Sequence, residues 1–505
     1  MVRKWFFFPL ISALLLVVPE ISYAGWTRTY GGETDDDVTF AQWHTDVRIS
    51  NTPGVSFVNR IGDCSIGADS SRVHIVWEEG DLFYAYIRYM GFPIGETPSA
   101  DSGEAVSDYL GKNPVIAVSN NVHVDWFGWP YVAFEKDLYF RERIGSSWGE
   151  IIGHGGTGIT VPESRFPAIA DDQYNNTHCV FNYRVITPTE GYVVVYQSRP
   201  AGEEKFGAFV QISTDPPSEG QDTYYPAICV ASDNSIHVAW CQQWNNRIGY
   251  TRSSNGGSSW SPPIEIPDVA CYYEYAPAIC FDKDGNFYVA YMDVTSPYQI
   301  YVVKRTGNTW GMPTNVSQTP EGLYIFHKTS ICADTFGNVW VFWAASGDAT
   351  RNREEIFYNR LQQGSVTWDG PKQLTPNDYS DSQYPHATAD RRGNVHLCWV
   401  DTRDGNQEIY YNWFEGGVAI EEQPRVTGEL SVSASFVSGK MRVTFALPKG
   451  QSGVLGVYNV SGQRVAQTSV SSSGQVEFSQ AFPRGVYLVR LESGGSSTTA
   501  KVVIQ

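Results

Sequence analysis

The chain has 505 residues, of which 14% are aromatic, 47 are glycine and 5 are methionine, a composition that favours short strands and tight turns over packed helices. The apolar fraction of 42% is enough for a folded core and excludes a disordered chain. The net charge is −18, from 36 Lys plus Arg and 54 Asp plus Glu. Because an acidic surface repels phosphate backbones and anionic lipid, we expect no nucleic-acid or membrane-surface partner.

The first 24 residues predict a secretory signal peptide. Arg3 and Lys4 precede an apolar run over residues 5–18, and Ser22 and Ala24 supply small residues at a cleavage site. The apolar run is too short to span a bilayer comfortably. No other segment is apolar enough to do so, and we therefore expect an exported chain with no transmembrane segment after signal removal.

A short segment and the turn before it recur over residues 25–418. The segment ends in an aromatic residue seven times: VHIVW to Trp77, PYVAF to Phe134, THCVF to Phe181, IHVAW to Trp240, FYVAY to Tyr291, VWVFW to Trp343 and VHLCW to Trp399. Turns such as DKDGN and DRRGN precede it, in which Asp bonds the turn backbone and Gly accepts a positive φ. Each unit then reads as four antiparallel strands, which cannot bury both faces alone. The repeats predict an all-β fold, a β-propeller of seven blades, with six or eight as alternatives because the second copy is irregular.

The segment at residues 43–50 is expected to complete the last blade. Ser50 follows Trp43 by the same spacing that separates Ser317 from Trp310 and Thr375 from Trp368. In the later copies this spacing marks the fourth strand of a unit. Since the last repeat shows only three strands, an N-terminal fourth strand would close the ring and remove an open sheet edge.

Four histidines occupy one position of the repeat. They are His74, His178, His237 and His396, and Tyr131, Tyr288 and Trp340 fill the same position in the other copies. Interchange with Tyr and Trp predicts a bulky side chain on a pleated strand rather than a metal ligand. No Cys/His spacing resembles a zinc site, and DKDGN is interpreted as a turn rather than a calcium loop. The sequence therefore predicts no metal and no cofactor.

Residues 253–260, SSNGGSSW, place Ser253, Asn255, Gly257 and Trp260 at the positions of a known turn motif. This segment resembles the Asp-box of sialidase-like propellers, with Asn in place of Asp. The resemblance implies a propeller in which the box is a structural turn on the face away from the active site. The arginine motif of sialidases is not matched at Arg60 or at Arg165, so the resemblance is specific for fold and weak for activity.

Functional residues are expected on the opposite face, in the loops that follow the second strands and connect the blades. Aromatic and basic side chains there suit stacking on sugar rings or a protein hot spot. The candidates for ligand binding are Tyr225, Trp244, Arg247, Tyr272, Tyr273, Tyr275 and Arg403. Weak catalytic candidates are Glu274, Tyr273, Asp401 and Arg403. The alternatives are that the tyrosines pack one blade against the next, that Glu274 is solvated, and that Asp401 and Arg403 form a loop ion pair.

Eight cysteines in an exported chain raise the question of disulfides. Cys229, Cys280 and Cys332 share one repeat position on successive inner strands, which diverge too far for a bond. Cys241 and Cys271 both fall on loops of the candidate functional face. They are the one pair for which the sequence favours a disulfide.

A polar linker at residues 419–428 leads to a tail of alternating apolar and polar residues at 429–505, which predicts a small Ig-like β-sandwich. A Gly-Gln turn at Gly462 and a Gly-Val-Tyr strand at Gly485 resemble the C-terminal sorting domain of type IX secretion. The resemblance implies the type IX machinery as a partner and a bacterial protein that is secreted or held on the outer cell surface. The alternative is a purely structural sandwich of the same shape.

Together these features predict an exported module that binds a glycan or a protein through its loop-rich face. One alternative is a carbohydrate-active enzyme, a sialidase-like glycoside hydrolase or a polysaccharide lyase, on the same face. A second alternative is a structural envelope protein. An enzyme requires a convergent cluster of arginines and paired carboxylates, whereas a binding module does not.

Overall fold

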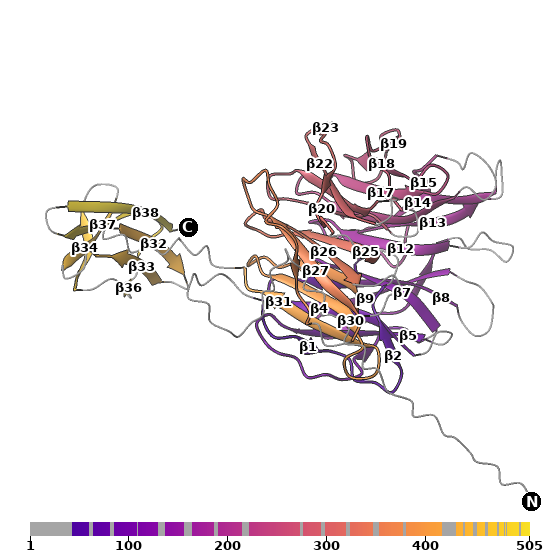
Figure 1. The fold of residues 1–505 in the computed structure, drawn as a ribbon, viewed down its shortest axis with the longest axis horizontal. Helices are drawn as coiled ribbons and strands as arrows, with labels where there is room; N and C mark the ends of the chain where they lie inside the picture. The colour runs from indigo at the N-terminus through magenta and orange to yellow at the C-terminus, as the bar shows by residue number, and fades with distance from the viewer. Residues whose placement is uncertain are drawn as a thin grey trace, which may run out of the picture. The chain divides into compact units, whose positions relative to one another are not determined.

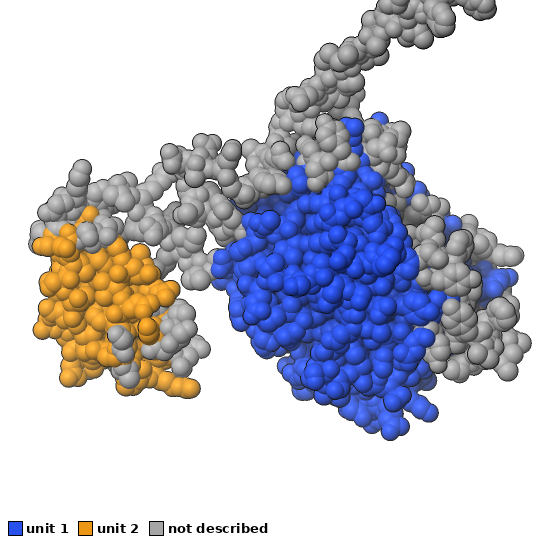
Figure 2. Space-filling view, turned by 90° about the horizontal axis from the view of Figure 1, so that it is seen from below, with its two compact units in different colours: residues 1–416 blue, residues 417–505 orange. Residues whose placement is uncertain are grey.

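The structure is a computed structural model of the chain. It describes residues 43–504 except for 60–63, 81–84, 109, 130–136, 156–163, 186–189, 215–221, 273–275, 294–297, 320–323, 347–352, 377–379, 417–430, 438–439, 448–451, 460–462, 472–473, 479, 481 and 494–495. The predicted signal peptide and the linker at 419–428 therefore lie outside the described residues. The chain divides into two compact units, residues 1–416 and 417–505 (Figure 2).

Every regular element among the described residues is a β-strand, which confirms the predicted all-β class (Figure 1). The strands of the first unit form seven antiparallel sheets of four or five strands each. The first three sheets are β2 (Val55–Phe57), β3 (Ile66–Ala68), β4 (Arg72–Gly80), β5 (Ala85–Pro93) and β6 (Glu104–Ala105); β7 (Leu110–Val118), β8 (Val122–Trp129), β9 (Asp137–Ile144), β10 (Ser147–Trp148) and β11 (Ile152–His154); and β12 (Ser164–Asp171), β13 (Thr177–Val185), β14 (Gly191–Arg199) and β15 (Val210–Gln211).

The remaining four sheets of this unit repeat the same order of strands. They are β16 (Thr223–Val230), β17 (Ile236–Gln242), β18 (Arg247–Ser253) and β19 (Ile264–Glu265); β20 (Ala278–Phe281), β21 (Phe287–Met292), β22 (Ile300–Thr306), β23 (Thr309–Trp310) and β24 (Thr314–Asn315); β25 (Tyr324–Ala333), β26 (Val339–Ser346), β27 (Glu354–Leu361) and β28 (Lys372–Gln373); and β29 (Ser382–Ala389), β30 (Val395–Asp401) and β31 (Glu408–Phe414) with β1 (Val47–Arg48).

The core of this unit lies between neighbouring sheets. Seven clusters of buried apolar side chains each draw their members from two successive sheets, and one of them joins the last sheet to the first. The innermost strands also contact one another in sequence, from β3 and β7 onward to β29, which returns to β3. These strands surround a cavity of about 370 Å³. The sheets therefore follow one another around a ring, because each can bury its two faces only against its neighbours.

The N-terminal segment completes the last sheet as predicted. Val47 and Arg48 of β1 pair with Tyr411 and Tyr410 of β31, and Trp43 bridges to Phe414. Trp43 is 7% exposed and meets four aromatic rings edge-on: Trp340, Phe342, Tyr358 and Phe414. Residues from both ends of the unit thus share one sheet and one apolar cluster.

The second copy of the repeat was placed wrongly by the sequence pattern. The predicted segment PYVAF ends at Phe134, which lies outside the described residues. The second strand of this sheet is instead β8, whose segment VHVDW ends at Trp126, and His123 pairs with Glu142 of β9. Both pentapeptides end in an aromatic residue, and only the pairing with β7 and β9 distinguishes them. His123 thereby becomes a fifth histidine at the repeat position.

The repeat histidines are structural. Nδ1 lies 2.7–2.8 Å from a tyrosine hydroxyl on the next strand in four sheets, in the pairs His74–Tyr89, His178–Tyr196, His237–Tyr250 and His396–Tyr411. The predicted turns are equally regular, since the carboxylates of Asp282, Asp334 and Asp390 accept backbone N–H groups two and four residues on. A repeated hydrogen bond of this kind is scaffold, which agrees with the interpretation made from the sequence.

The second unit consists of two sheets around one apolar cluster. One sheet has the order β32 (Ser431–Val437), β33 (Lys440–Ala446) and β36 (Gly474–Phe478); the other has the order β35 (Arg464–Val470), β34 (Gly453–Asn459), β37 (Gly485–Ser493) and β38 (Ser496–Ile504). Along β37 buried and exposed residues alternate, as expected for a sheet with one face toward a core. The described residues contain no helix long and apolar enough to cross a membrane.

Candidate functional site

Bulky residues in strained backbone conformations mark the innermost strands. Phe166, Tyr225 and Tyr384 have φ angles of 52°, 52° and 55°, and each precedes a proline. Each also lies at a bulge in its strand, where the register shifts. The same conformation occurs at a fourth bulge, where Asn113 has a φ of 54° and precedes Pro114, so the strained bulge is a feature of the repeat. The copies differ in the side chain that this position carries, which is aromatic at Phe166, Tyr225 and Tyr384.

Two of these residues belong to one aromatic cluster, which we define as Phe166, Tyr192, Tyr224 and Tyr225. The ring of Phe166 lies 4.6 Å from that of Tyr225, the two neighbouring tyrosines stack at 5.3 Å, and Tyr192 lies 6.2 Å from Tyr224. Phe166, Tyr224 and Tyr225 are half-buried. The guanidinium of Arg165 lies 4.8 Å from the ring centre of Tyr192. The cluster joins the third sheet to the fourth.

Buried polar groups hold the aromatic cluster in place. The carboxylate of Asp222 accepts the hydroxyl of Tyr224 at 2.7 Å and the backbone N–H of Tyr192 at 2.8 Å. Asn182 accepts the N–H of Tyr225 at 3.0 Å and donates to the carbonyl of Thr223 at 2.8 Å. These bonds connect strands of both sheets, so the rings sit on a rigid support, as a preorganised binding surface requires.

Burial and the neighbouring Asp222 carboxylate raise the pKa of Tyr224 well above its ordinary value. The phenol therefore stays protonated at neutral pH. A tyrosine nucleophile needs the opposite shift, because its anion is the reactive form. Tyr224 is consequently suited to contact and hydrogen bonding rather than to covalent catalysis.

The predicted ligand-binding residues separate into several places. Tyr225 belongs to the aromatic cluster, and Trp244 is half-buried in the turn between β17 and β18. The N–H of Gln243 donates to the carbonyl of Asp222 at 3.0 Å, which ties that turn to the cluster. The guanidinium of Arg247 donates to the carbonyl of Val269 at 2.6 Å and thereby anchors a loop.

Tyr272 packs elsewhere, with its ring 5.0 Å from that of Tyr298. Tyr273, Glu274 and Tyr275 lie outside the described residues. Among the predicted tyrosines, the structure therefore places Tyr225 in the cluster and Tyr272 away from it. The roles of Tyr273, Glu274 and Tyr275 stay predictions.

Asp401 and Arg403 form the ion pair that was the alternative to a catalytic role. The guanidinium donates to both Asp401 oxygens, at 2.9 and 2.6 Å, and to Asp46 at 2.8 Å. Asp401 is fully buried and also accepts the indole N–H of Trp399 and the hydroxyl of Ser382. Because Asp46 belongs to the N-terminal segment, this network fastens the closing strand.

The Asp-box residues form a turn between β18 and β19. The N–H of Gly257 donates to the Ser253 hydroxyl at 2.9 Å, and the N–H of Ser259 donates to Asn255 Oδ1 at 2.9 Å. The ring of Trp260 lies 4.8 Å from that of Tyr196 in the preceding sheet. Asn thus performs the acceptor role of the usual Asp, and Trp260 packs between sheets.

No disulfide joins any of the eight cysteines in this structure. The sulfur atoms of Cys241 and Cys271 lie 3.5 Å apart and both side chains are buried. The two residues predicted as a pair are therefore neighbours, and the disulfide between them stays a prediction.

The central cavity offers little catalytic chemistry among its described lining residues. Aliphatic side chains and four thiols dominate the lining, and Lys328 is the charged residue among them. A cluster of arginines with paired carboxylates, the arrangement that an enzyme requires, does not occur among these described residues.

Phe166, Tyr192 and Tyr224 were not among the sequence-predicted site residues. The signals that point to them are short: Arg165 and Phe166 precede Pro167, and the doublet of Tyr224 and Tyr225 precedes Pro226. Neither pattern indicates that the two segments meet, because the contact depends on the packing of neighbouring sheets.

Comparison with known proteins identifies the C-terminal part of the chain. Residues 437–505 match the family described as "Secretion system C-terminal sorting domain", which confirms the predicted sorting domain. The chain is accordingly a secreted or outer-surface protein that engages a secretion machinery through this domain. No curated protein matches the chain.

Solved structures with a similar fold include carbohydrate-active enzymes. The polysaccharide lyase Uly1 has 8% sequence identity and a TM-score of 0.47, with 74% of this chain and 100% of that chain covered. A PL25 ulvan lyase has 11% identity and a TM-score of 0.47, with 72% and 94% covered. A mutant of NanB sialidase from Streptococcus pneumoniae has 10% identity and a TM-score of 0.41, with 73% and 94% covered. At TM-scores below 0.5 these similarities carry no argument about the activity of this chain.

Proposed function

We propose that the chain is an exported, surface-displayed glycan-binding protein whose first unit is a seven-bladed β-propeller and whose second is an Ig-like sorting domain. The propeller follows from the seven successive sheets, the apolar cluster at each of the seven interfaces and the closing pair β1–β31. In this arrangement the repeated hydrogen bonds form the scaffold. Binding then belongs to the residues that differ between the copies.

The observation that carries the proposed function is the aromatic cluster. Half-buried rings at the start of β12 and β16 present faces on which the apolar side of a sugar ring can stack. The Tyr224 hydroxyl, Asp222 and Arg165 supply polar groups beside those faces. Strained positions at Phe166 and Tyr225 hold two of the rings where an ordinary strand would not place them.

The test is a glycan array probed with the full exported chain. Tyr225→Ala removes a central ring and is expected to weaken binding about tenfold or more, equivalent to about 1.4 kcal/mol. Tyr224→Phe keeps the ring and removes the hydroxyl that Asp222 holds, so a smaller loss is expected. Tyr174→Ala serves as the matched control, because Tyr174 is 66% exposed and lies in the turn between β12 and β13.

The same preparation should be incubated with a panel of chromogenic glycosides and uronic-acid polysaccharides. Binding without turnover supports a binding module. Turnover that Tyr225→Ala abolishes would replace the proposal with a carbohydrate-active enzyme on the same surface. Equal binding by Tyr225→Ala and the unaltered chain would move the site away from the aromatic cluster.

A further inference from the structure

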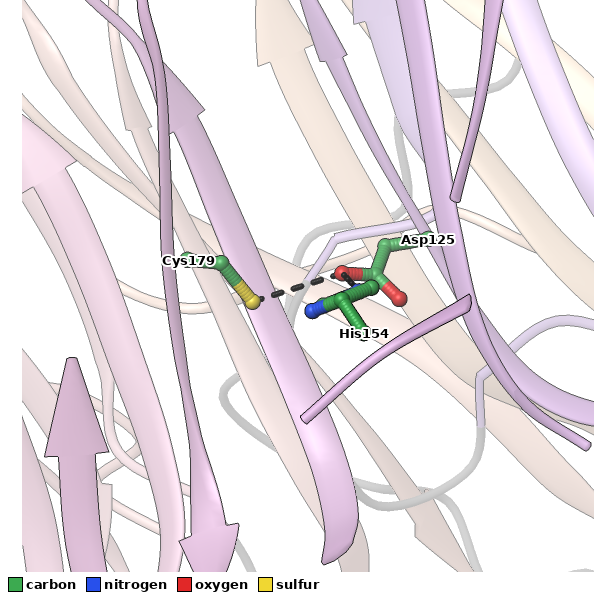
Figure 3. Close-up of side chains that lie close together, drawn as sticks. All are labelled: Asp125, His154 and Cys179. Carbon is green, nitrogen blue, oxygen red and sulfur yellow. Dashed lines mark hydrogen bonds and ion pairs between the residues drawn. The ribbon is translucent and has the colours of Figure 1, made fainter. Parts of the chain in front are cut away.

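Three side chains with metal-binding atoms meet in the interface between the second and third sheets (Figure 3). Asp125 belongs to β8, His154 to β11 and Cys179 to β13. The His154 Nε2 atom lies 2.9 Å from Asp125 Oδ2, and the Cys179 Sγ atom lies 3.3 Å from the same oxygen. All three ligand atoms lie within 4.8 Å of one another, and the three residues are 0–4% exposed.

Asp125 and His154 each replace an apolar residue of the repeat, and Cys179 stands where the other copies have Ile, Val or Leu. The position of Asp125 holds Val76, Val180, Ala239, Ala290, Phe342 and Cys398 in the other sheets, and that of His154 holds Ile49, Val106, Ile212, Ile266, Val316 and Leu374. The position of Cys179 holds Ile75, Val124, Val238, Val289, Val341 and Leu397. These three residues, each different from its counterparts in the other sheets, therefore lie together in one interface.

Burying these groups in place of aliphatic side chains is costly unless something compensates the charge. A buried ion pair is often no more stabilising than the apolar residues it replaces. Asp125 Oδ1 is buried and makes no hydrogen bond among the described residues, and His154 Nε2 faces the carboxylate without hydrogen-bond geometry. The Nε2 atom and the sulfur of Cys179 both lie beside Asp125 Oδ2, whereas Oδ1 is on the side of the carboxylate away from the sulfur (Figure 3).

The surroundings of His154 select the form of imidazole that binds metals. Its Nδ1 lies 3.2 Å from Gln197 Oε1, and the amide nitrogen of Gln197 donates to the carbonyl of Gly207. Because that amide presents its oxygen to Nδ1, Nδ1 carries a proton, and Nε2 is the ring nitrogen that a metal ion beside Asp125 would bind. A hydrogen bond of this kind is typical of metal-binding histidines. The ring of Phe206 stacks on the imidazole, with the ring centres 4.3 Å apart, and covers one of its faces.

We propose that Asp125, His154 and Cys179 bind one divalent ion of the zinc class, which links the second sheet to the third. One carboxylate, one imidazole and one thiolate are ligands that Zn²⁺ accepts in a tetrahedral site, where ligand atoms lie about 3.2–3.7 Å apart. The observed nitrogen–oxygen and sulfur–oxygen distances, 2.9 and 3.3 Å, are close to these values. The dication also balances the two negative charges of carboxylate and thiolate, and binding releases the thiol proton.

The alternative occupant of this space is a proton. Burial lowers the pKa of His154, but Asp125, Gln197 and Asp137 together raise it by more. A protonated His154 would then form a buried ion pair with Asp125 and leave Cys179 as a thiol. The zinc-bound and the protonated forms of the protein differ in metal content and in whether Cys179 is a thiolate or a thiol, and both properties are measurable.

The first experiment uses the unaltered full chain, purified after growth with Zn²⁺ and dialysed against metal-free buffer. One equivalent of zinc per chain is expected, and zinc-edge X-ray absorption should show one sulfur together with nitrogen and oxygen neighbours. Replacement by Co²⁺ should produce a sulfur-to-cobalt charge-transfer band. Zinc-free protein that also gives no such band with Co²⁺ would overturn the proposal.

Variants assign the ligands. Asp125→Val installs the residue that Val76 and Val180 provide in neighbouring sheets, so the fold has a precedent for it. Asp125→Val and Cys179→Ser are each expected to lower the bound zinc at least tenfold, and Gln197→Leu to weaken affinity by about tenfold to a hundredfold. Cys398→Ser is the matched control, because Cys398 is equally buried on a second strand but lies outside the cluster.

Retention of full zinc by both Asp125→Val and Cys179→Ser, with the native circular dichroism spectrum, would place the metal elsewhere and refute the assignment. A chelator should lower the melting temperature of the unaltered chain and of Cys398→Ser, since a metal bound to the folded state stabilises it. It should leave that of Asp125→Val unchanged. The absorption spectra of the unaltered chain decide the matter even where a variant does not fold.

Discussion

His123 makes the stability of the first unit depend on pH in an unusual direction. In this sheet Phe140 stands where the four other sheets with a repeat histidine have its tyrosine partner, and both ring nitrogens face carboxylates. Nδ1 lies 2.8 Å from Asp171 and Nε2 lies 3.2 Å from Glu142, which also binds Arg199 at 2.7 Å. Burial lowers the pKa of His123, but these carboxylates raise it by more, to about 9.

The contribution of His123 to the free energy of unfolding follows from the difference between its pKa in the folded chain and its ordinary pKa. That difference, 9 − 6.5 = 2.5, corresponds to about 3 kcal/mol at 1.36 kcal/mol for each pH unit. Since the folded pKa is raised, the contribution is present in full below pH 6.5 and is lost as the pH rises through 9. We therefore expect the free energy of unfolding to fall by about 2–3 kcal/mol between pH 7 and pH 9.5 on account of this residue.

The assay is urea unfolding followed by tryptophan fluorescence, which reports on the first unit because all 16 tryptophans precede residue 417. His123→Gln should be less stable than the unaltered chain at pH 7 and should lack this part of the pH dependence. His237→Gln is the control, because burial, Arg305 and Arg252 lower the pKa of His237 to about 3 and keep it neutral throughout. Parallel stability curves for His123→Gln and the unaltered chain from pH 7 to 9.5 would refute the reasoning.

Three further outcomes are expected. Trp43→Ala should destabilise the first unit by about 3–5 kcal/mol in urea, because it empties the contact of four aromatic rings at the closing strand; a loss below about 1 kcal/mol would mean that the N-terminal segment contributes little to closure. Arg403→Ala leaves Asp401 and Asp46 uncompensated and should cost about 3 kcal/mol while glycan affinity stays unchanged; weaker binding at unchanged stability would restore Arg403 as a ligand contact. Deletion of residues 437–505 should abolish delivery to the cell exterior, as measured by fractionation, and undiminished secretion would show that another segment directs export.

Many features of the fold can be predicted from short stretches of the sequence. Aromatic closing residues, Asp-Gly turns and the repeated histidine position all depend on residues close in the chain, so their roles were predictable before any coordinates. The pairing of residues 43–50 with the last sheet was also predictable, because Trp43 and Ser50 carry the same spacing as the other fourth strands. The sorting domain was likewise recognisable from its turns and strands.

What the tertiary structure alone decided concerns neighbours that lie far apart in sequence. The register of the second copy depended on pairing with β7 and β9, since two pentapeptides fitted the pattern equally well. The aromatic cluster and the Asp125–His154–Cys179 group each assemble across two sheets, and no spacing marks them. Alternation and turn chemistry determine which face of a strand is buried, but which side chains meet between two sheets is set by how those sheets pack. For that reason the sequence could specify the scaffold and the tail, while the candidate sites became visible only in three dimensions.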